Sequence, residues 1–355
     1  PSAKDRVYAK RGGFLDDILF DPLRYGMPPN SLSSVEPLHL MALEAVRHAL
    51  RDAGYEEKEF SRETTSVIIG TGGGIGELGQ SYVVRSALPE FFEGADDVSK
   101  DLPEWTEDSF PGILMNVMAG RIANRFNFGG VNYTVDAACA SSIAALYDAV
   151  RELDTRTSDM VIAGGADAGQ NPFAYLCFSK THALSPGGNC RVFDEKADGT
   201  VISEGLCFLV LKRLPDAQMD GDRIYAVIKS VAGSSDGRQK GLTAPNPLGQ
   251  LSALRRAYSK AGFDPATLGL LEAHGTGTVV GDRVEAESAG LLLKEHKARR
   301  GNCAIGSVKS VIGHTKGAAG LAGVIKTALA LYHKVLPPTA SVQKPNSAEF
   351  QDGPI

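Results

Sequence analysis

Three residues able to perform chemistry stand in segments of small side chains. They are Cys139 in Val135-Asp-Ala-Ala-Cys139-Ala-Ser-Ser142, His274 in Glu272-Ala-His274-Gly-Thr-Gly-Thr278, and His314 in Lys309-Ser-Val-Ile-Gly-His314-Thr-Lys-Gly-Ala-Ala-Gly320. A thiolate attacks an acyl carbonyl, and a neutral imidazole donates a hydrogen bond to the oxyanion that develops. The set therefore predicts carbon–carbon bond formation on thioesters.

Cys139 lies where a predicted strand gives way to a predicted helix. Val131–Asp136 alternates in polarity, and Ala140–Val150 repeats apolar residues at helical spacing. The unpaired N–H groups of a helix N-terminus favour a thiolate, so we expect a thiol pKa below the usual value of about 8.5. An inert, buried thiol is the alternative. The alanine and serine neighbours of Cys139 favour a nucleophile, because they leave room for a substrate.

Each histidine follows a predicted strand. Leu268–Ala273 leads into the glycine and threonine loop of His274, and Cys303–Val308 leads into the loop that holds His314. Gly317–Leu331 is predicted to be a helix of small residues, so His314 precedes a helix N-terminus, where an imidazolium is disfavoured. One such histidine is more often structural. Two in similar settings indicate a pair of neutral catalytic rings.

The order of these motifs and of others along the chain resembles that of the β-ketoacyl synthases, the condensing enzymes of fatty acid and polyketide assembly. The others are Arg191-Val-Phe-Asp194, Asp198-Gly199, Glu204-Gly205, Gly241-Leu-Thr-Ala-Pro245, Gly249-Gln250, and Gly281-Asp282 with Glu285. The resemblance covers almost the whole chain. Details such as Cys177-Phe-Ser-Lys-Thr181 and Ser234-Ser-Asp-Gly237 are most similar to ketosynthase domains of type I iterative polyketide synthases, including the polyunsaturated-fatty-acid and enediyne types.

The resemblance implies a thiolase-like α/β fold, in which two similar βαβαβαββ halves form five αβαβα layers. We expect residues 1–220 to form the half that carries Cys139, and residues 221–355 to form the half that carries both histidines. A strand, a loop with a reactive residue and a helix recur at Val131–Val150 and Ala304–Leu331. The boundary follows the apolar run Leu206–Leu211, and Ile224–Ile228 is predicted to begin the second half as a strand.

The same resemblance implies a role for each residue of the central trio. Cys139 accepts the acyl group, and its own backbone N–H is one oxyanion donor. His274 and His314 promote decarboxylation of a malonyl unit and stabilise the resulting enolate. The implied reaction is a decarboxylative Claisen condensation of an acyl-Cys enzyme with malonyl-acyl carrier protein.

Further residues are implied to support this trio. Lys309 matches a lysine that supports the histidines electrostatically, and a buried lysine needs an anionic partner. Asp282 or Glu285 is expected to be that partner, although surface charge near a helix N-terminus is an alternative for both acids. Thr276 and Thr278 match residues that hydrogen-bond the phosphopantetheine arm.

The resemblance also implies the partners. They are acyl carrier protein, a second copy in a homodimer, and other domains of a multidomain synthase. We expect no cofactor bound by this domain, and no metal site, because the five cysteines contain no CxxC pair. Gly70–Gly76 is interpreted as a structural turn rather than a dinucleotide loop.

Related functions remain open at this stage. One alternative is a malonyl decarboxylase or an acyltransferase variant of the same fold. Another is a scaffold protein similar to chain-length factors, which keep the fold but lack the nucleophile. The presence of Cys139 together with both histidines argues against the scaffold.

Composition limits the class of protein. A chain of 355 residues with 43% hydrophobic residues can bury a large core. Five cysteines without framework spacing argue against a disulfide-stapled secreted protein, and the net charge of −5 argues against nucleic acid as a partner. No run approaches the roughly 18 apolar residues of a membrane span, and no signal peptide is visible. These features predict a cytoplasmic enzyme.

Three features depart from the family pattern. Pro1-Ser-Ala-Lys4 opens the chain without the usual hydrophobic first strand. The chain stops at Ile355, ahead of the glycine-phenylalanine loop that supplies the second oxyanion donor, so we expect it to be part of a complete ketosynthase. Val311 stands where many relatives have asparagine, which leaves the hydrogen bonding around His314 open.

Overall fold

Two sheets form the framework of the protein. The computed structural model describes residues 4–93, 99–238, 241 and 244–355. The first sheet has the strand order β2-β1-β3-β4, and β4 alone among these runs antiparallel to its neighbour. The second sheet pairs β5 and β6 in parallel. The strands are β1 (Thr65–Gly70), β2 (Asn132–Val135), β3 (Met160–Asp167), β4 (Gly205–Leu211), β5 (Leu270–Glu272) and β6 (Ala304–Gly306).

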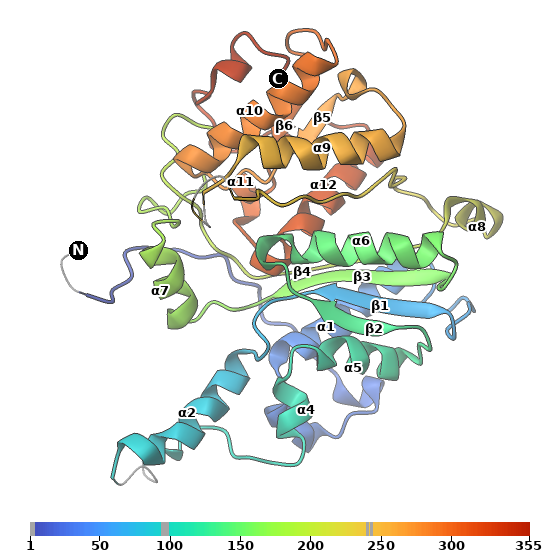
Figure 1. The fold of residues 1–355 in the computed structure, drawn as a ribbon. Coiled ribbons are helices and arrows are strands. Elements are labelled where there is room, and N and C mark those ends of the chain that lie inside the picture. Colours follow the sequence, from blue (N-terminus) through green and yellow to red (C-terminus); the bar gives the residue numbers. More distant parts are fainter. Residues whose placement is uncertain (1–3, 94–98, 239–240, 242–243) are drawn as a thin grey trace.

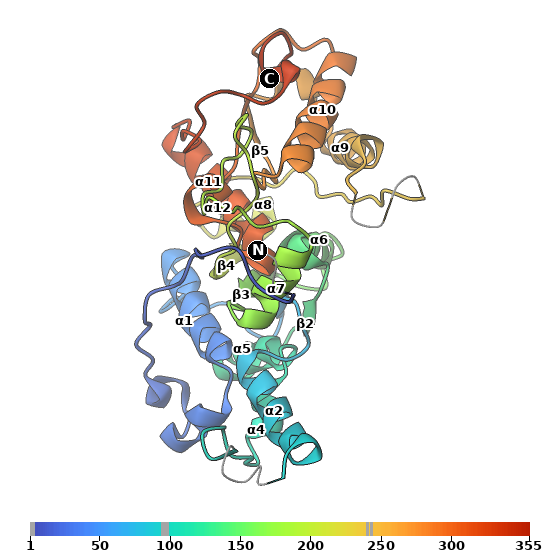
Figure 2. The same cartoon turned by 90° about the vertical axis from the view of Figure 1, so that its left-hand side faces the viewer.

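Helices cover both faces of the first sheet (Figure 1). α1 (Pro37–Asp52) and α5 (Val117–Phe126) pack on one face, while α6 (Ser141–Asp154) and α12 (Ala319–His333) pack on the other. α12 also contacts β5, and α9 (Pro247–Ala261) and α10 (Val279–Glu295) lie together at the far end of the molecule (Figure 2). This succession of helix, sheet, helix, sheet and helix confirms the predicted five layers.

Shorter elements connect these layers. The other helices of the described residues are α2 (Glu77–Phe91), α4 (Ser109–Ile113), α7 (Pro172–Lys180), α8 (Leu214–Met219) and α11 (Lys309–Ile312). The 3-10 turns are η1 (Pro22–Tyr25), η2 (Pro29–Ser34), η3 (Ala138–Ala140), η4 (Pro265–Thr267), η5 (Lys316–Ala318) and η6 (Ala348–Phe350). Two of the turns, η3 and η5, contact each other where α6 and α12 begin.

The core lies on both faces of β1, which is buried along its whole length. Val67 and Ile69 belong to the cluster beneath α1 and α5, whereas Ile68 belongs to the cluster beneath α6 and α12. This division follows from the strand period of two, which sends successive side chains to opposite faces. A strand buried on both faces is typical of a parallel sheet between helices.

The two predicted strand–turn–helix units are present. In the first unit, β2 leads through η3 into α6, and in the second, β6 leads through α11 and η5 into α12. The predicted loop Lys309–Thr315 differs in detail, because Lys309–Ile312 forms one helical turn.

The predicted strand at Ile224–Ile228 is wrong, since residues 223–238 contain no strand. Its apolar, β-branched composition is typical of a strand, but a strand also needs a hydrogen-bonded neighbour. Among the described residues, β5 and β6 pair only with each other. Leu242 and Thr243 of the Gly241–Pro245 motif, and Pro1–Ala3, lie outside the described residues.

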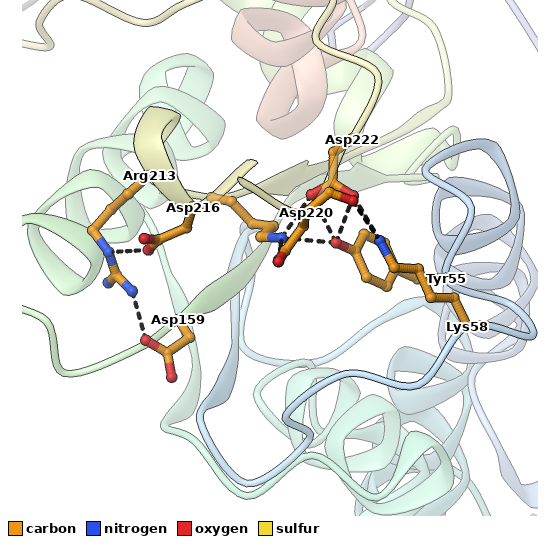
Figure 3. A network of polar contacts seen from close by, with 8 residues as sticks. Tyr55, Lys58, Asp159, Arg213, Asp216, Asp220 and Asp222 are labelled. Atoms are coloured by element: carbon orange, nitrogen blue, oxygen red, sulfur yellow. Dashed lines mark hydrogen bonds and ion pairs between the residues drawn. The ribbon is translucent and has the colours of Figure 1, made fainter. Parts of the chain in front are cut away.

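A charged network fixes the turn after β4, near the predicted boundary at residue 220 (Figure 3). Lys212 pairs with Asp220, and its Nζ lies 2.6 Å from a carboxylate oxygen of Asp222. The Tyr55 hydroxyl donates to Asp222 at 2.7 Å, and Lys58 Nζ lies 3.3 Å from the same carboxylate. Because Tyr55 follows α1, the network ties the N-terminal helix to the end of β4.

Candidate active site

Cys139 lies in η3, between β2 and α6. Ala138 has a φ of 51°, a left-handed conformation that costs a non-glycine residue about 1–2 kcal/mol. The Ala138 N–H donates to Asp136 Oδ1 at 2.9 Å, and Ser141 Oγ donates to the Ala138 carbonyl at 2.6 Å. Ser141 Oγ also accepts from the Ala137 N–H at 2.8 Å. These bonds hold the turn in a conformation that the sequence pattern did not reveal.

Glycines let α6 approach β1 and α12 closely. A Cβ on Gly70 would lie 2.2 Å from the Ser141 carbonyl carbon, and one on Gly320 would lie 2.4 Å from Ile143 Cγ1. The Ser142 Oγ accepts from the backbone N–H of Leu321 at 3.2 Å, which links the first turns of the two helices. The site is therefore built where the N-terminal ends of the two helices meet.

His274 and His314 meet edge to face, with ring centroids 5.3 Å apart and planes at 87°. The His274 N–H donates to Glu285 Oε1 at 2.6 Å, and the Gly275 N–H donates to Oε2 at 2.8 Å. Burial raises the pKa of the Glu285 carboxyl, while these two hydrogen bonds lower it by a smaller amount. Glu285 therefore fixes the backbone that carries His274, rather than standing as surface charge.

Backbone hydrogen bonds hold His314 on three sides. Its N–H donates to the Val201 carbonyl at 2.7 Å, and its carbonyl accepts from the Ser203 N–H at 2.9 Å. The Lys316 N–H donates to His314 Nδ1 at 3.0 Å. Because an amide N–H can only donate, Nδ1 carries no proton, and the proton of the neutral ring is on Nε2. Val311, which is 70% exposed, is not among these partners.

Both imidazoles are neutral at pH 7. Desolvation by the surrounding protein atoms is the larger cause that lowers the pKa of His274 to about 4, and the positive charge of Lys309 is the smaller one. Part of the His274 residue is nevertheless exposed to solvent. Burial lowers the pKa of His314 well below its usual value, followed by the charges of Lys309, His274 and Lys316. Each ring can therefore donate a hydrogen bond to an oxyanion without first losing a proton.

Lys309 acts on all three predicted catalytic residues. It is 3% exposed, and burial lowers its pKa, while Glu285 and then Glu272 oppose that shift. Its charge in turn lowers the pKa values of Cys139, His274 and His314. The structure thus brings Cys139, His274 and His314 within electrostatic reach of Lys309.

The predicted pKa of Cys139 is wrong in direction. Burial raises the pKa of this half-buried thiol and outweighs the lowering by Lys309, by its own backbone N–H and by Lys316. Asp167 raises the pKa further. The loss of water around the sulfur raises the thiol pKa more than the N-terminus of α6 and the nearby cations lower it.

Asp282 supports a different segment from the one expected. It is fully buried, accepts from the Phe193 N–H at 2.6 Å and accepts from the Gly277 N–H at 3.0 Å. Burial raises its pKa to about 6. Gly277 separates Thr276 and Thr278, whose hydroxyl oxygens lie 3.0 Å apart. Asp282 therefore positions the loop Thr276–Thr278, called here the threonine loop. The anionic partners of Lys309 are Glu285 and, second, Glu272.

Three charged residues near the site were not predicted from the sequence: Glu272, Lys316 and Asp167. Glu272 accepts from the Val308 N–H at 2.5 Å and pairs with Lys326 Nζ at 2.6 Å. Lys316 pairs with Asp167 at 3.1 Å. Glu272 and Lys316 belong to the two histidine motifs. A charged residue among small residues was therefore the sequence feature that could have indicated a role for each. Their partners, however, come from other elements.

Comparison with known proteins places the chain in a family. Residues 1–217 match the beta-ketoacyl synthase N-terminal domain, and residues 225–343 match the beta-ketoacyl synthase C-terminal domain. The chain therefore belongs to the β-ketoacyl synthases. It is 41% identical over 359 residues to a polyunsaturated fatty acid synthase of Thraustochytrium sp., covering 97% of this chain and 13% of that one. It is 38% identical to polyketide synthase PksN of Bacillus subtilis, covering 94% of this chain and 6% of that one.

Solved ketosynthase structures share the fold. The oxazolomycin ketosynthase domain OzmH KS7 of Streptomyces albus superposes with a TM-score of 0.84 at 34% identity, covering 97% of this chain and 58% of that chain. The module 6 ketosynthase of the Bacillus subtilis bacillaene synthase gives a TM-score of 0.81 at 34% identity, with coverage of 94% and 55%. These neighbours confirm the thiolase-like fold.

The chain spans a small part of its curated relatives and just over half of the solved chains. The predicted division at residue 220 stays a prediction. Across the described residues, every helix is too short or too polar to cross a membrane.

Proposed function

We propose that this chain is a ketosynthase that condenses an acyl-Cys139 thioester with malonyl-acyl carrier protein. The observation that carries the proposal is that one buried lysine, Lys309, acts electrostatically on Cys139 and on two neutral histidines that meet edge to face. A thiol, two hydrogen-bond donors and a buried cation form a set suited to acyl transfer and enolate stabilisation.

The first step transfers an acyl chain to the protein. The Cys139 sulfur attacks the thioester carbonyl, a new C–S bond forms, and the carrier thiol leaves with the proton that the cysteine gave up. Lys309 lowers the pKa of Cys139 against the effect of burial, which favours the attacking thiolate. The Cys139 N–H stabilises the tetrahedral oxyanion as one of its donors.

The second step forms the carbon–carbon bond. The malonyl carboxylate leaves as carbon dioxide, and the electron pair of the broken bond becomes the enolate. His314, with its proton on Nε2, and His274 donate hydrogen bonds to the enolate oxygen. The enolate carbon then attacks the acyl carbonyl, the C–S bond breaks, and Cys139 returns as a thiolate beside a β-ketoacyl carrier product.

The threonine loop binds the arm that delivers both substrates. Thr276 and Thr278 place two hydroxyl groups side by side, and Asp282 holds the backbone between them. Such a pair suits the amide and hydroxyl groups of phosphopantetheine. The carrier protein is therefore the source of substrate, and the domain binds no resident cofactor for this chemistry.

We also propose a homodimer within a larger synthase. β2 is an edge strand of the first sheet; Tyr133 within it is 37% exposed, and Val131, just before it, is 42% exposed. An unpaired strand edge with apolar side chains is suited to pairing with a second copy of the same edge.

Intact-mass analysis tests the proposed activity. Wild type and Cys139→Ala are each incubated with an acyl-carrier thioester and then with malonyl-carrier protein. Acylation of wild type alone, followed by release of a β-ketoacyl carrier, is the expected result. Acylation without condensation would favour the acyltransferase or decarboxylase variant, and absence of acylation would contradict the proposal.

A further inference from the structure

Lys316 is a buried cation next to the proposed active site. It is 9% exposed, and its Nζ lies 3.1 Å from Asp167 Oδ1 at the end of β3. The same ammonium donates to the Ser203 carbonyl at 2.9 Å. A buried ammonium group is retained only where an anion and hydrogen-bond acceptors compensate the loss of water. Asp167 and Ser203 provide that compensation here.

These contacts form a closed ring with His314. The Lys316 side chain reaches the Ser203 carbonyl, the Ser203 N–H donates to the His314 carbonyl at 2.9 Å, and the Lys316 N–H donates to His314 Nδ1 at 3.0 Å. Ser203 and Lys316 are 113 residues apart in sequence. The ring therefore holds both the backbone and the imidazole of His314 through contacts between separate segments.

The backbone of Lys316 has a conformation that is rare for a residue with a side chain. Its φ is 48°, in the left-handed region that a side-chain-bearing residue avoids. In this conformation its N–H is directed at His314 Nδ1. The contacts of Lys316 Nζ with Asp167 and with the Ser203 carbonyl anchor this turn to β3 and to the segment before β4. Without these anchors the turn can shift as a unit, and the Lys316 N–H then moves away from His314 Nδ1.

We propose that Lys316, held by Asp167, is the positioning residue that fixes His314 as the neutral tautomer with its proton on Nε2. The consequence for catalysis rests on the proposed condensing function, in which that proton is donated to the enolate. The position of the proton itself does not depend on that function, so the two ideas can fail separately.

Several charged and titratable groups surround His314, so a test must distinguish the effect of Lys316 from the effects of the others. Lys309 and Lys316 come from the segment of His314 itself, His274 comes from the loop after β5, and Asp167 comes from β3. Removing the Lys316 charge also removes one cation from the surroundings of Cys139. A direct readout of the His314 proton is therefore needed beside kinetics.

Nitrogen NMR of the full chain provides that readout. The chain has seven histidines, which are labelled with ¹⁵N, and His314→Gln assigns the signal. At pH 7 wild type should show an unprotonated Nδ1 and a protonated Nε2 for His314. In Lys316→Met this pattern should collapse towards averaged tautomers, while the His274 signal keeps its position. Asp167→Asn should give a partial collapse, and Lys316→Arg should retain the wild-type pattern.

Lys212→Met is the matched control. The Lys212 side chain is 10% exposed and pairs with Asp222, as the Lys316 side chain is 11% exposed and pairs with Asp167, but Lys212 belongs to the network of Figure 3. Its loss should leave the His314 signal unchanged. An unchanged signal in both Lys316→Met and Asp167→Asn would overturn the proposal, as would an equal change in Lys212→Met.

Kinetics then connect the tautomer to catalysis. With pre-acylated enzyme, Lys316→Met should lower kcat for condensation by up to about 100-fold, the loss typical of a misplaced group, with KM for malonyl-carrier protein little changed. Lys316→Arg should restore most of the rate. A changed tautomer with an unchanged rate would refute the catalytic role. Failure of wild type to be acylated would refute the proposed function and leave the NMR result standing.

Discussion

Replacing Asp282 with asparagine should change how stability depends on pH. The Asp282 carboxylate is fully buried and accepts two backbone N–H groups, from Phe193 at 2.6 Å and from Gly277 at 3.0 Å. Burial nevertheless dominates and raises its pKa from 3.8 to about 6. The folded protein therefore binds the carboxyl proton more tightly than the unfolded chain does.

The sign and size of the effect follow from linkage. Stability from this group is greatest at low pH, falls as the pH rises from about 4 to about 6, and is constant above that range. A rise in pKa from 3.8 to about 6 corresponds to about 3 kcal/mol, of which about 2 kcal/mol is lost between pH 4.5 and pH 7. The asparagine of the variant does not titrate, so it adds no pH dependence to the unfolding free energy. Its amide accepts the two backbone hydrogen bonds less well than a carboxylate, which lowers the stability of the variant by about 1–3 kcal/mol at every pH.

Urea unfolding of wild type and Asp282→Asn at several pH values measures this difference. The unfolding free energy of wild type minus that of the variant should fall by about 2 kcal/mol between pH 4.5 and pH 7. Glu287→Gln, which removes an exposed acid from the same helix, is the control. A difference that stays constant or grows with pH would refute the reasoning. The variant should also raise KM for acyl carriers, because Gly277 loses a charged anchor.

Other predictions test the residues around the thiol and the rings. Alkylation of Cys139 by iodoacetamide, followed by peptide mass spectrometry, should be slow at pH 7 and still rising at pH 9, because burial raises the thiol pKa. Lys309→Met should slow the alkylation further. An alkylation rate of wild type that levels off below pH 8 would contradict the raised thiol pKa. Condensation by pre-acylated enzyme should show no step near pH 6.5, since the pKa of His274 is about 4, and should decline only below about pH 5. Gly70→Ala should destabilise the protein by about 1–3 kcal/mol and slow acylation, because its Cβ would lie 2.2 Å from the start of α6. Gly233→Ala, which meets open space, should do neither, and equal losses in both would contradict the packing argument.

The sequence by itself determined the local units that carry the site. Alternating polarity before Cys139 and helical spacing after it correctly predicted β2 and α6, and the same reasoning predicted β6 and α12 around His314. Such patterns are local, because the side-chain period of a strand or helix shows within a few residues. The motifs in their order also indicated the family that the comparisons confirm.

The tertiary structure alone decided the electrostatics of the site. The pKa of Cys139 is raised because atoms from several elements exclude water, and no run of neighbours in sequence reveals that density. Either Asp282 or Glu285 was expected beside Lys309; Glu285 acts on Lys309, whereas Asp282 holds the loop Thr276–Thr278. The closed ring of contacts among Lys316, Ser203 and His314 depends on Ser203, which is 113 residues from Lys316 in sequence. Spacing fixes which residues can react, whereas desolvation and distant contacts fix the protonation state in which they do so.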